Sequence, residues 1–367
     1  MKIIIIVNTS WNIYNFRKKL LISLLEIGHE VIAVAPYDSY VELLESLGIK
    51  CINIKLNQKG TNPFSDTLLI YRYFKIFNYQ KPDLILSYTI KPNIYGNIAA
   101  GLLKTPIINN ISGLGTLFIK TSIATIIAKF LYRFSLKYSS HVFFQNNDDK
   151  KLFIKNKLVN PNITSIIPGS GVDVKKFSCD RVKNEGNKFL FVGRLIGDKG
   201  VFEYLDAAVL VLKKHPEKEF LLVGEIGYNN KTALSKEQLL NYTDNYAQIR
   251  YLGNTDDIVG LLKSVDIVVL PSYREGLSKS LIEAASMSLP IITTDSPGCR
   301  DVVKNNYNGI LCKIKSSESL SSAMLRMIKL SPNKRLQMGL NGRKISIENF
   351  EEKIIINHYL RVLKLIV

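Results

Sequence analysis

The residues best suited to catalysis lie in one run, PSYREGLSKSLIEA at residues 271–284. The run follows the apolar stretch Ile267–Leu270, which has the pattern of a buried strand, and it leads into a helical pattern. The first N–H groups of such a helix have no partners within the helix, so they are suited to binding a diphosphate. Glu283 lies four residues beyond Lys279 on the same helix face, where a carboxylate can accept hydrogen bonds from sugar or ribose hydroxyls. A solvated helix surface is the alternative, but the neighbours of Glu283 are apolar.

A second run, FVGRLIGDKG at residues 191–200, has the same layout. A strand pattern ends at a glycine, and Arg194 and Lys199 flank the turn into the next helix. Arginine meets a diphosphate with its planar fork, and lysine meets it as a point charge. Basic residues in loops are more often simply solvated, so this run gains weight from its pairing with the first.

The sequence has no sign of a metal site or of a cofactor. The glycine clusters Gly113-Leu114-Gly115 and Gly169-Ser170-Gly171 lack the spacing of dinucleotide and phosphate-binding loops, so we interpret them as turns. No Asp-x-Asp follows a strand pattern, and the four histidines are scattered. The four cysteines lie far apart, which argues against a disulfide framework and suits a reducing compartment.

Short β-rich runs alternate with helical patterns along the whole chain, which predicts an α/β fold with parallel sheets. The expected strands are Ile3–Val7, Val31–Ala35, Cys51–Ile54, Leu84–Ser87, Ile107–Asn110 and Val142–Gln145, then Lys188–Val192, Phe220–Val223, Arg250–Leu252, Ile267–Leu270 and Pro290–Thr293. The expected helices of the first series are Phe16–Leu25, Val41–Leu47, Phe64–Phe77, Asn93–Leu103 and Ser122–Lys137.

The two series of strands predict two domains. Between them the segment 167–173 (IPGSGVD) has the glycines and proline of a hinge. We expect two doubly wound, Rossmann-like parallel sheets facing each other across a cleft, with ligands bound beyond the carboxyl ends of the strands. The N-terminal domain spans 1–170 and is completed by a C-terminal helix at 351–367, and the C-terminal domain spans 171–350.

Charge is distributed unevenly. Residues 1–176 hold 22 Lys and Arg against 10 Asp and Glu, and residues 84–147 hold no carboxylate. A compositional bias of the source explains a basic total but not a one-sided one, so we expect attraction to an anionic membrane surface. No apolar run is long enough for a membrane span or an export signal, which predicts a cytoplasmic location. No nucleic-acid-binding signature is present.

Both catalytic runs resemble those of the retaining glycosyltransferases of family four, which have the GT-B fold. Glu275 and Glu283 match the paired glutamates of that family, and Gly193-Arg194 with Lys199-Gly200 matches its basic loop. The likeness continues through MSLPIITTD at 287–295 and PGCRD at 297–301, and GSGVD at 169–173 is similar to the entry into the C-terminal domain.

The resemblance implies the roles of the donor-site residues. Glu275, Arg194 and Lys199 are the expected catalytic residues, with Glu275 at the transferred sugar and Glu283 at the ribose. The expected donor-binding residues are Arg194, Lys199, Gly253, Asn254, Glu275, Gly276, Leu277, Ser278, Lys279, Ser280 and Glu283. The family is generally independent of metals, and its nucleotide-sugar, here expected to be a UDP-sugar, is a co-substrate rather than a cofactor. Its retention of configuration is described as same-face attack, without an enzymic nucleophile.

The first half resembles a narrower group that extends polyprenyl-diphosphate-linked sugars in surface polysaccharide or glycan assembly. The matching segments are SYTIKPNIYG at 87–96 and NISGLG at 110–115. Many relatives have a histidine near Ile90 and a glycine-rich turn after the first strand, and this chain has neither. The acceptor-binding candidates are therefore Asn12, Tyr14, Lys91 and Gly113.

The segment Ser122–Lys137 has apolar residues at helical spacing and a basic edge formed by Lys129, Arg133 and Lys137. We expect its apolar face to pack on the sheet of its own domain, and we assign the basic edge to lipid or to the pyrophosphate of the acceptor. Such a helix can also lie in a membrane interface. The expected location is peripheral, on the inner face of the membrane.

Two other functions fit parts of the sequence. A nucleotide-sugar epimerase shares the architecture, but it needs acid and base groups at the sugar and this chain has few histidines. The second alternative is a basic membrane-binding module without activity. Loss of nucleotide-sugar binding in Arg194→Ala and Lys199→Ala, with lipid binding intact, would favour a transferase over such a module.

Overall fold

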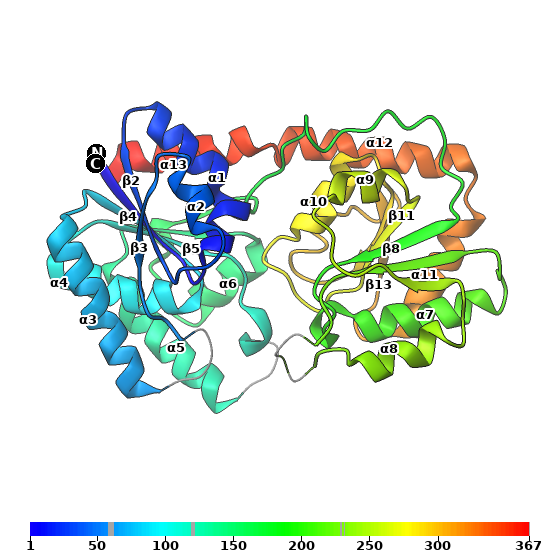
Figure 1. Cartoon of the computed structure of the whole chain (residues 1–367), viewed down its shortest axis with the longest axis horizontal. Coiled ribbons are helices and arrows are strands. Elements are labelled where there is room, and N and C mark those ends of the chain that lie inside the picture. Colours follow the sequence, from blue (N-terminus) through cyan, green and yellow to red (C-terminus); the bar gives the residue numbers. More distant parts are fainter. Residues whose placement is uncertain (58–61, 119–121, 228–229, 231, 367) are drawn as a thin grey trace. The chain divides into compact units, whose positions relative to one another are not determined.

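The computed structural model describes residues 1–57, 62–118, 122–227, 230 and 232–366. It divides into two compact units (Figure 1). Unit 1 contains Met1–Ser170 together with Glu352–Val367, and unit 2 contains Gly171–Glu351.

The described part of unit 1 forms a seven-stranded parallel sheet in the order β3-β2-β1-β4-β5-β6-β7. Its strands are β1 (Lys2–Ile6), β2 (Glu30–Ala35), β3 (Lys50–Asn53), β4 (Leu84–Tyr88), β5 (Ile107–Ile111), β6 (His141–Phe144) and β7 (Thr164–Ile166). In β1, Ile4 pairs with Ile32 of β2 on one side and with Ile85 of β4 on the other. Its isoleucines are fully buried on both faces, which explains their unbroken apolar run.

Helices cover both faces of this sheet. Residues of α1, α2 and α13 pack with Ile3 and Ile5 on one face, and residues of α3, α4, α5 and α6 pack with Ile4 and Ile6 on the other. The helices are α1 (Ser10–Glu26), α2 (Val41–Glu45), α3 (Pro63–Gln80), α4 (Asn97–Leu103), α5 (Ile123–Ser135), α6 (Asn147–Lys155) and α13 (Glu352–Ile366). The last helix of the chain therefore belongs to the core of the first unit.

The described part of unit 2 forms a six-stranded parallel sheet in the order β10-β9-β8-β11-β12-β13 around one core. Its strands are β8 (Lys188–Val192), β9 (Glu219–Val223), β10 (Ile249–Tyr251), β11 (Ile267–Leu270), β12 (Ile291–Thr294) and β13 (Gly309–Cys312). Its helices are α7 (Val201–Leu212), α8 (Lys236–Thr243), α9 (Ile258–Lys263), α10 (Lys279–Ser286), α11 (Ser317–Lys329) and α12 (Pro332–Asn349). Because all strands of a sheet are parallel, they end at one edge, and both catalytic runs begin at that edge.

The expected α/β class with parallel sheets is confirmed, and two edge strands were missed. β7 is short and polar, so its sequence resembles a loop. β13 begins at Gly309, where a Cβ atom would lie 2.2 Å from the carbonyl oxygen of Ile291 on the neighbouring strand. The expected helix Asn93–Leu103 is also interrupted, because a π-helical turn, η1 (Pro92–Gly96), precedes α4.

The expected packing of α5 is wrong. Its buried side consists of Thr125, Ala128, Tyr132 and Ser135. Its exposed large apolar residues are Ile123, Ile126, Ile127, Phe130 and Phe134. Periodicity identified the two faces but not which of them meets the sheet, because small residues with a single tyrosine fill the narrow space there.

Candidate active site

In unit 2, the loops after β8 and β11 are held together by their backbones. Gly200 has φ 76°, and a Cβ atom there would lie 2.2 Å from the carbonyl oxygen of Pro271. The N–H of Tyr273 and the hydroxyl of Ser272 both donate to the carbonyl oxygen of Asp198, at 2.9 and 3.2 Å. The two catalytic runs of the sequence thus form one structure at the carboxyl edge of the sheet.

Lys199 and Glu275 form an ion pair across these loops. Their side chains are only 19% and 13% exposed, so each charge is largely shielded from water and compensated by the other. The N–H of Glu275 donates to the carbonyl oxygen of Pro297, and Gly298, with φ 77°, lies directly against the Glu275 backbone. The carboxylate predicted to meet the transferred sugar is therefore held from two sides.

Helix α10 starts three residues after Gly276. Ser278 is its N-cap and makes no side-chain capping bond to the first turn. The N–H of Ser278 donates to the carbonyl oxygen of Gly298, which joins the helix start to the segment that holds Glu275. Lys199, Glu275 and the start of α10 therefore share one edge, as the sequence predicts, and Arg194 is exposed just after β8 on the same edge.

Glu283 lies one turn into α10, with Lys279 Nζ 3.9 Å from its carboxylate. Burial raises the pKa of Glu283 to about 7, against the opposing charges of Lys279 and Lys176. A carboxyl group whose pKa is raised by burial beside a specific charged partner is a candidate for a functional site.

Three glycines line the ends of β8, β9 and β10. The N–H of Gly193 donates to Val223, and the N–H of Gly224 donates to Gly253, both at 3.0 Å. A Cβ atom on Gly224 would lie 1.9 Å from the carbonyl oxygen of Gly193, so the backbones meet without side chains. Beyond them Gly253 has open space and Asn254 is exposed, an arrangement that leaves room for a flat base.

Two residues that contact Tyr273, namely Glu203 and Lys315, could not be identified from the sequence. The hydroxyl of Tyr273 donates to Glu203 Oε1 at 2.5 Å, and Lys315 Nζ lies 5.0 Å from the centre of its ring. Burial and the Glu203 carboxylate raise the pKa of Tyr273. Glu203 lies in the first turn of α7, and only the folded chain brings it to the loop of Glu275.

Unit 1 presents neutral polar groups at the carboxyl edge of its sheet. Asn12, in the first turn of α1, donates its N–H to Thr9 Oγ1, and its own Oδ1 is buried without a hydrogen-bond partner in the described chain. Gly113 has φ 113° in the loop after β5. Tyr14 is occupied locally, since its hydroxyl accepts from Lys18 Nζ at 3.1 Å.

Lys91 is paired within unit 1. Its Nζ atom lies 2.8 Å from Asp66 Oδ1, and the hydroxyl of Tyr95 donates to the other oxygen of that carboxylate at 2.7 Å. The side chains of Lys91 and Asp66 are 13% and 9% exposed. The acceptor role of Lys91, like those of Asn12, Tyr14 and Gly113, stays a prediction.

Thr89 was not singled out from the sequence. It follows β4 with φ 66°, a strained conformation for a β-branched residue, and its Oγ1 is buried without a hydrogen-bond partner in the described chain. β4 is the neighbour of β1, so Thr89 and the start of α1 lie at adjacent strand ends. No motif signals this strain, because it depends on the surrounding fold.

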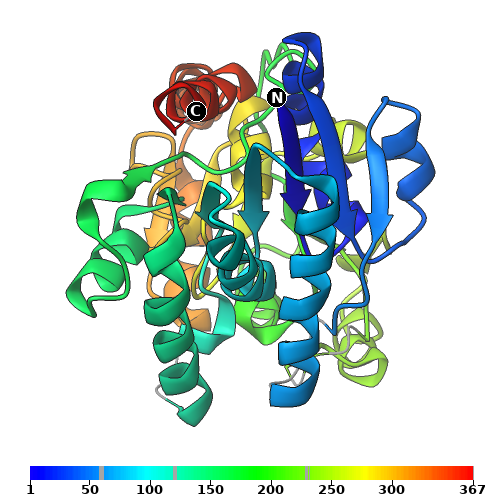
Figure 2. The same cartoon turned by 90° about the vertical axis from the view of Figure 1, so that its left-hand side faces the viewer.

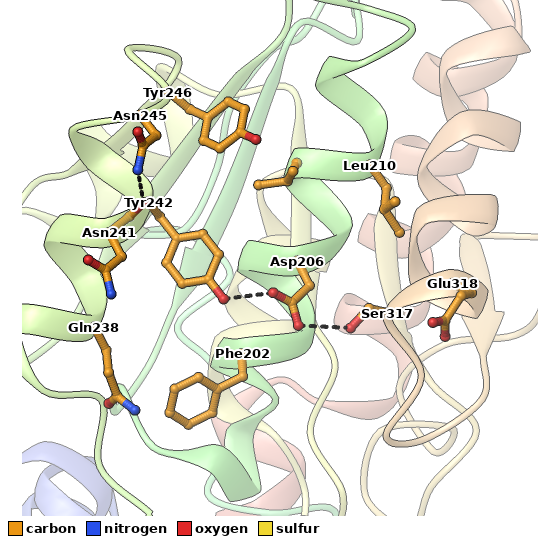
Figure 3. A pocket seen from close by; sticks show the side chains of 11 residues that line it. Phe202, Asp206, Leu210, Gln238, Asn241, Tyr242, Asn245, Tyr246, Ser317 and Glu318 are labelled. Carbon is orange, nitrogen blue, oxygen red and sulfur yellow. Dashed lines mark hydrogen bonds between the residues drawn. The ribbon is translucent and has the colours of Figure 1, made fainter.

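A groove of about 860 Å³ lies elsewhere in unit 2, between α7, α8 and the start of α11 (Figure 3). Asp206 accepts hydrogen bonds there from Tyr242 at 2.6 Å and from Ser317 at 3.4 Å. None of the expected site residues lines this groove. Among the described residues, no cluster of His, Cys, Asp and Glu has the arrangement of a metal site.

Two family models match the chain. The model described as glycosyl transferase 4-like matches residues 2–146, and the model described as glycosyl transferases group 1 matches residues 173–345. The two matches fall one in each half of the chain and agree with the resemblance to family four, and the chain is a glycosyltransferase.

The relatives of the chain are glycosyltransferases as well. It is 28% identical to the N,N'-diacetylbacillosaminyl-diphospho-undecaprenol alpha-1,3-N-acetylgalactosaminyltransferase of Campylobacter jejuni, over 96% of this chain and 95% of that protein. It is 29% identical to the UDP-Gal:alpha-D-GlcNAc-diphosphoundecaprenol alpha-1,3-galactosyltransferase of Escherichia coli, over 76% and 72%.

Solved structures show the same fold. A glycosyltransferase from Rickettsia africae superposes with a TM-score of 0.80 at 19% identity, over 100% of this chain and 98% of that one. Anabaena HepE in complex with UDP superposes with a TM-score of 0.80 at 18% identity, over 99% and 100%. The fold of the chain is GT-B. Within the described residues, no helix combines the length and apolar character needed to cross a membrane.

Proposed function

We propose that this enzyme transfers a hexose or N-acetylhexosamine from a UDP-sugar to a polyprenyl-diphosphate-linked sugar, with retention of configuration and without a metal ion. The names of the two relatives support this acceptor class, since both describe action on sugars linked to diphospho-undecaprenol. The UDP in the HepE structure supports the donor class. The product would extend a lipid-linked glycan in surface polysaccharide assembly.

The observation that carries the proposal is the Lys199–Glu275 ion pair beside the uncapped start of α10. A donor diphosphate at this edge would draw the ammonium group of Lys199 from Glu275 and release that carboxylate to face the sugar. Arg194, Lys199 and the first N–H groups of α10 would then stabilise the charge that develops on the leaving diphosphate. Stabilisation of this kind is commonly worth several kcal/mol of the barrier.

The proposed reaction requires no nucleophile from the enzyme. The bond from the anomeric carbon to the diphosphate oxygen breaks, and the acceptor hydroxyl oxygen bonds to that carbon from the same face. The departing phosphate oxygen takes the proton of the acceptor hydroxyl. Glu283 would accept hydrogen bonds from the ribose, while the backbone at Gly253 and Asn254 would lie against the base.

The acceptor lipid would place the enzyme at a membrane. We propose a cytoplasmic enzyme, peripheral on the inner face and attracted to its anionic surface, which is consistent with the 22 basic residues against 10 acidic ones in residues 1–176.

The test is a donor screen with purified protein and a short-chain polyprenyl-diphosphate N-acetylhexosamine, read by mass spectrometry. UDP-glucose, UDP-galactose and their N-acetyl forms are compared with GDP-mannose, with and without EDTA, and the product linkage is determined by NMR. We expect transfer from one UDP-sugar, unchanged by EDTA, with an α-linkage. An isomerised donor without any acceptor would instead establish an epimerase, and loss of transfer in EDTA would refute metal independence.

A further inference from the structure

The outer face of α5 is apolar. Ile123, Ile126, Ile127, Phe130 and Phe134 are 78%, 61%, 41%, 67% and 43% exposed, and they follow one stripe along the helix. A surface helix of a monomeric protein normally shows polar residues on this side. Contiguous exposed apolar patches mark contacts with another molecule or with a membrane.

The helix is well ordered by its own contacts despite this exposure. Ser122 and Thr125 form a capping box at its start. Tyr132 is fully buried against the ring of Phe153 of α6, at 5.1 Å between ring centres. Lys129 Nζ donates to Asn156 Oδ1 at 3.2 Å, which turns this lysine towards α6 and away from the apolar stripe. The exposed stripe is therefore a fixed surface of unit 1.

The charged side chains of α5 and of the turn after it are all positive. Arg133 and Lys137 are exposed in and just after the last turn, and residues 84–147 contain no carboxylate. A second copy docked symmetrically on this face would bring the same cations together without an acidic partner on that segment. An anionic bilayer matches both features, because its acyl boundary accepts the apolar side chains and its headgroups attract the cations.

The position of α5 relates this surface to the proposed acceptor site. The helix leaves the carboxyl edge of the unit 1 sheet after β5 and returns towards the amino edge before β6. In Figure 2, where unit 1 faces the viewer, the strands point down and the teal α5 starts at the lower edge, as does the blue α3. The start of α5 therefore lies at the edge that carries Asn12 and Thr89.

We propose that the outer face of α5 docks on the surface of an anionic phospholipid bilayer and thereby holds the carboxyl edge of unit 1 at the level of the lipid headgroups. The proposal rests on the proposed function in one respect only, namely that the diphosphate-linked end of the acceptor lipid would meet the carboxyl edge of unit 1 at this level. The bilayer contact itself requires no transfer reaction.

The test is flotation of the full chain with vesicles that contain no acceptor. Phosphatidylcholine vesicles are compared with vesicles in which about one third of the lipid is phosphatidylglycerol. Ile126→Ser/Ile127→Ser/Phe130→Ser should weaken binding to anionic vesicles roughly tenfold or more. Val182→Ser/Leu240→Ser/Leu365→Ser, three exposed apolar residues elsewhere, is the matched control and should bind like the wild type.

The charge arm uses Arg133→Gln/Lys137→Gln, with Lys213→Gln/Lys214→Gln on an exposed part of unit 2 as its control. We expect a loss of about fivefold for each α5 charge removed. The proposal would be overturned if the α5 variants bound anionic vesicles as well as the wild type does. It would also be overturned if the wild type bound neutral and anionic vesicles equally well. A dimer in sedimentation velocity that the triple serine variant abolishes would overturn it too, since the occupant would then be a second copy.

A separate assay distinguishes this proposal from the proposed function. Transfer to a short, water-soluble acceptor should be unchanged in the triple serine variant, and transfer to acceptor in vesicles should fall with vesicle binding. Absence of all transfer in the wild type would refute the proposed function while the flotation result stands on its own.

Discussion

The carboxyl edges of the two sheets differ in chemistry. Unit 2 gathers charge there, with Lys199 paired to Glu275, and three glycines bring the strand ends together. Unit 1 also holds an ion pair, between Lys91 and Asp66, and it adds neutral buried oxygens of Asn12 and Thr89 that have no hydrogen-bond partner in the described chain. A site for a diphosphate requires fixed charges, whereas a site for sugar hydroxyls requires neutral donors and acceptors. The difference supports donor binding by unit 2 and acceptor binding by unit 1.

The largest effect should follow removal of the charge that we propose meets the donor diphosphate. Lys199→Ala should lower kcat about 10³-fold, which corresponds to about 4 kcal/mol of barrier. The reason is that the variant lacks an ammonium group that would stabilise the charge developing on the leaving diphosphate. Initial rates at saturating donor and acceptor measure this. Lys213→Ala, an exposed lysine of the same unit, is the control, and a rate loss as large in that variant would show that overall charge, rather than this site, is responsible.

The close contact of the two loops in unit 2 should be nearly as sensitive. Gly200→Ala adds a Cβ atom 2.2 Å from Pro271 O at φ 76°. We therefore expect the variant to lose about 2–4 kcal/mol of stability and also to lose transfer activity. Gly227→Ala has φ 71° and open space, and should cost only about 1 kcal/mol. Urea unfolding of both variants gives the comparison. Similar losses would mean that backbone conformation alone matters.

In unit 1, the strained residue after β4 should affect acceptor use and not donor binding. Thr89→Gly relieves a positive φ and should stabilise the protein by about 1 kcal/mol while lowering kcat/KM for the acceptor about tenfold. Lys157→Gly relieves a similar φ of 53° at an exposed position and should leave transfer unchanged. Donor affinity, measured by calorimetry, should be constant in both. A weaker donor affinity in Thr89→Gly would contradict the division between the units.

The last effect should come from Glu283, and unlike the others it should depend on pH. The folded protein holds the proton of Glu283 more tightly than the unfolded chain, with a pKa of about 7 against 4.5. Stability from this group is therefore present below about pH 4.5 and is lost as the pH rises through 7. Glu283→Gln should raise the free energy of unfolding by about 1–3 kcal/mol at pH 8.5, with little change at pH 4.5, and weaken donor binding.

Glu348 provides the control for this pH effect. It has the same i,i+4 pairing with a lysine, Lys344, but its side chain is 55% exposed. Glu348→Gln should show no such dependence in thermal unfolding between these pH values. A pH-independent gain in Glu283→Gln would mean that burial of the charge is not the cause.

The donor half of the site could be predicted because its chemistry is local in sequence. Lys199 and Glu275 lie in the loops that follow β8 and β11, Glu283 lies on the helix after the second loop, and the order of parallel strands brings those strand ends together. Glu203, Thr89 and Asp66 could not be found in this way. Their roles depend on tertiary contacts, namely a hydrogen bond to Tyr273, a strained backbone and an ion pair with Lys91.

The same distinction applies to the fold. Central strands such as β1 and β11 are continuous apolar runs, so their bounds were predicted to within about a residue. The edge strands β7 and β13 have weak patterns and were missed. Periodicity located α5 but assigned the wrong side to the core, because a hydrophobic stripe does not say whether protein or lipid covers it.

The placement of α13 affects the order in which the chain can mature during synthesis. The hydroxyl of Tyr359 accepts a hydrogen bond from Asn110 Nδ2 at 2.8 Å, and its ring packs on Phe143 of β6. Unit 2 is complete once residue 351 has left the ribosome, but unit 1, although made first, must wait for α13. A nascent chain therefore exposes the apolar surface beneath that helix until α13 has been made, after the whole of unit 2.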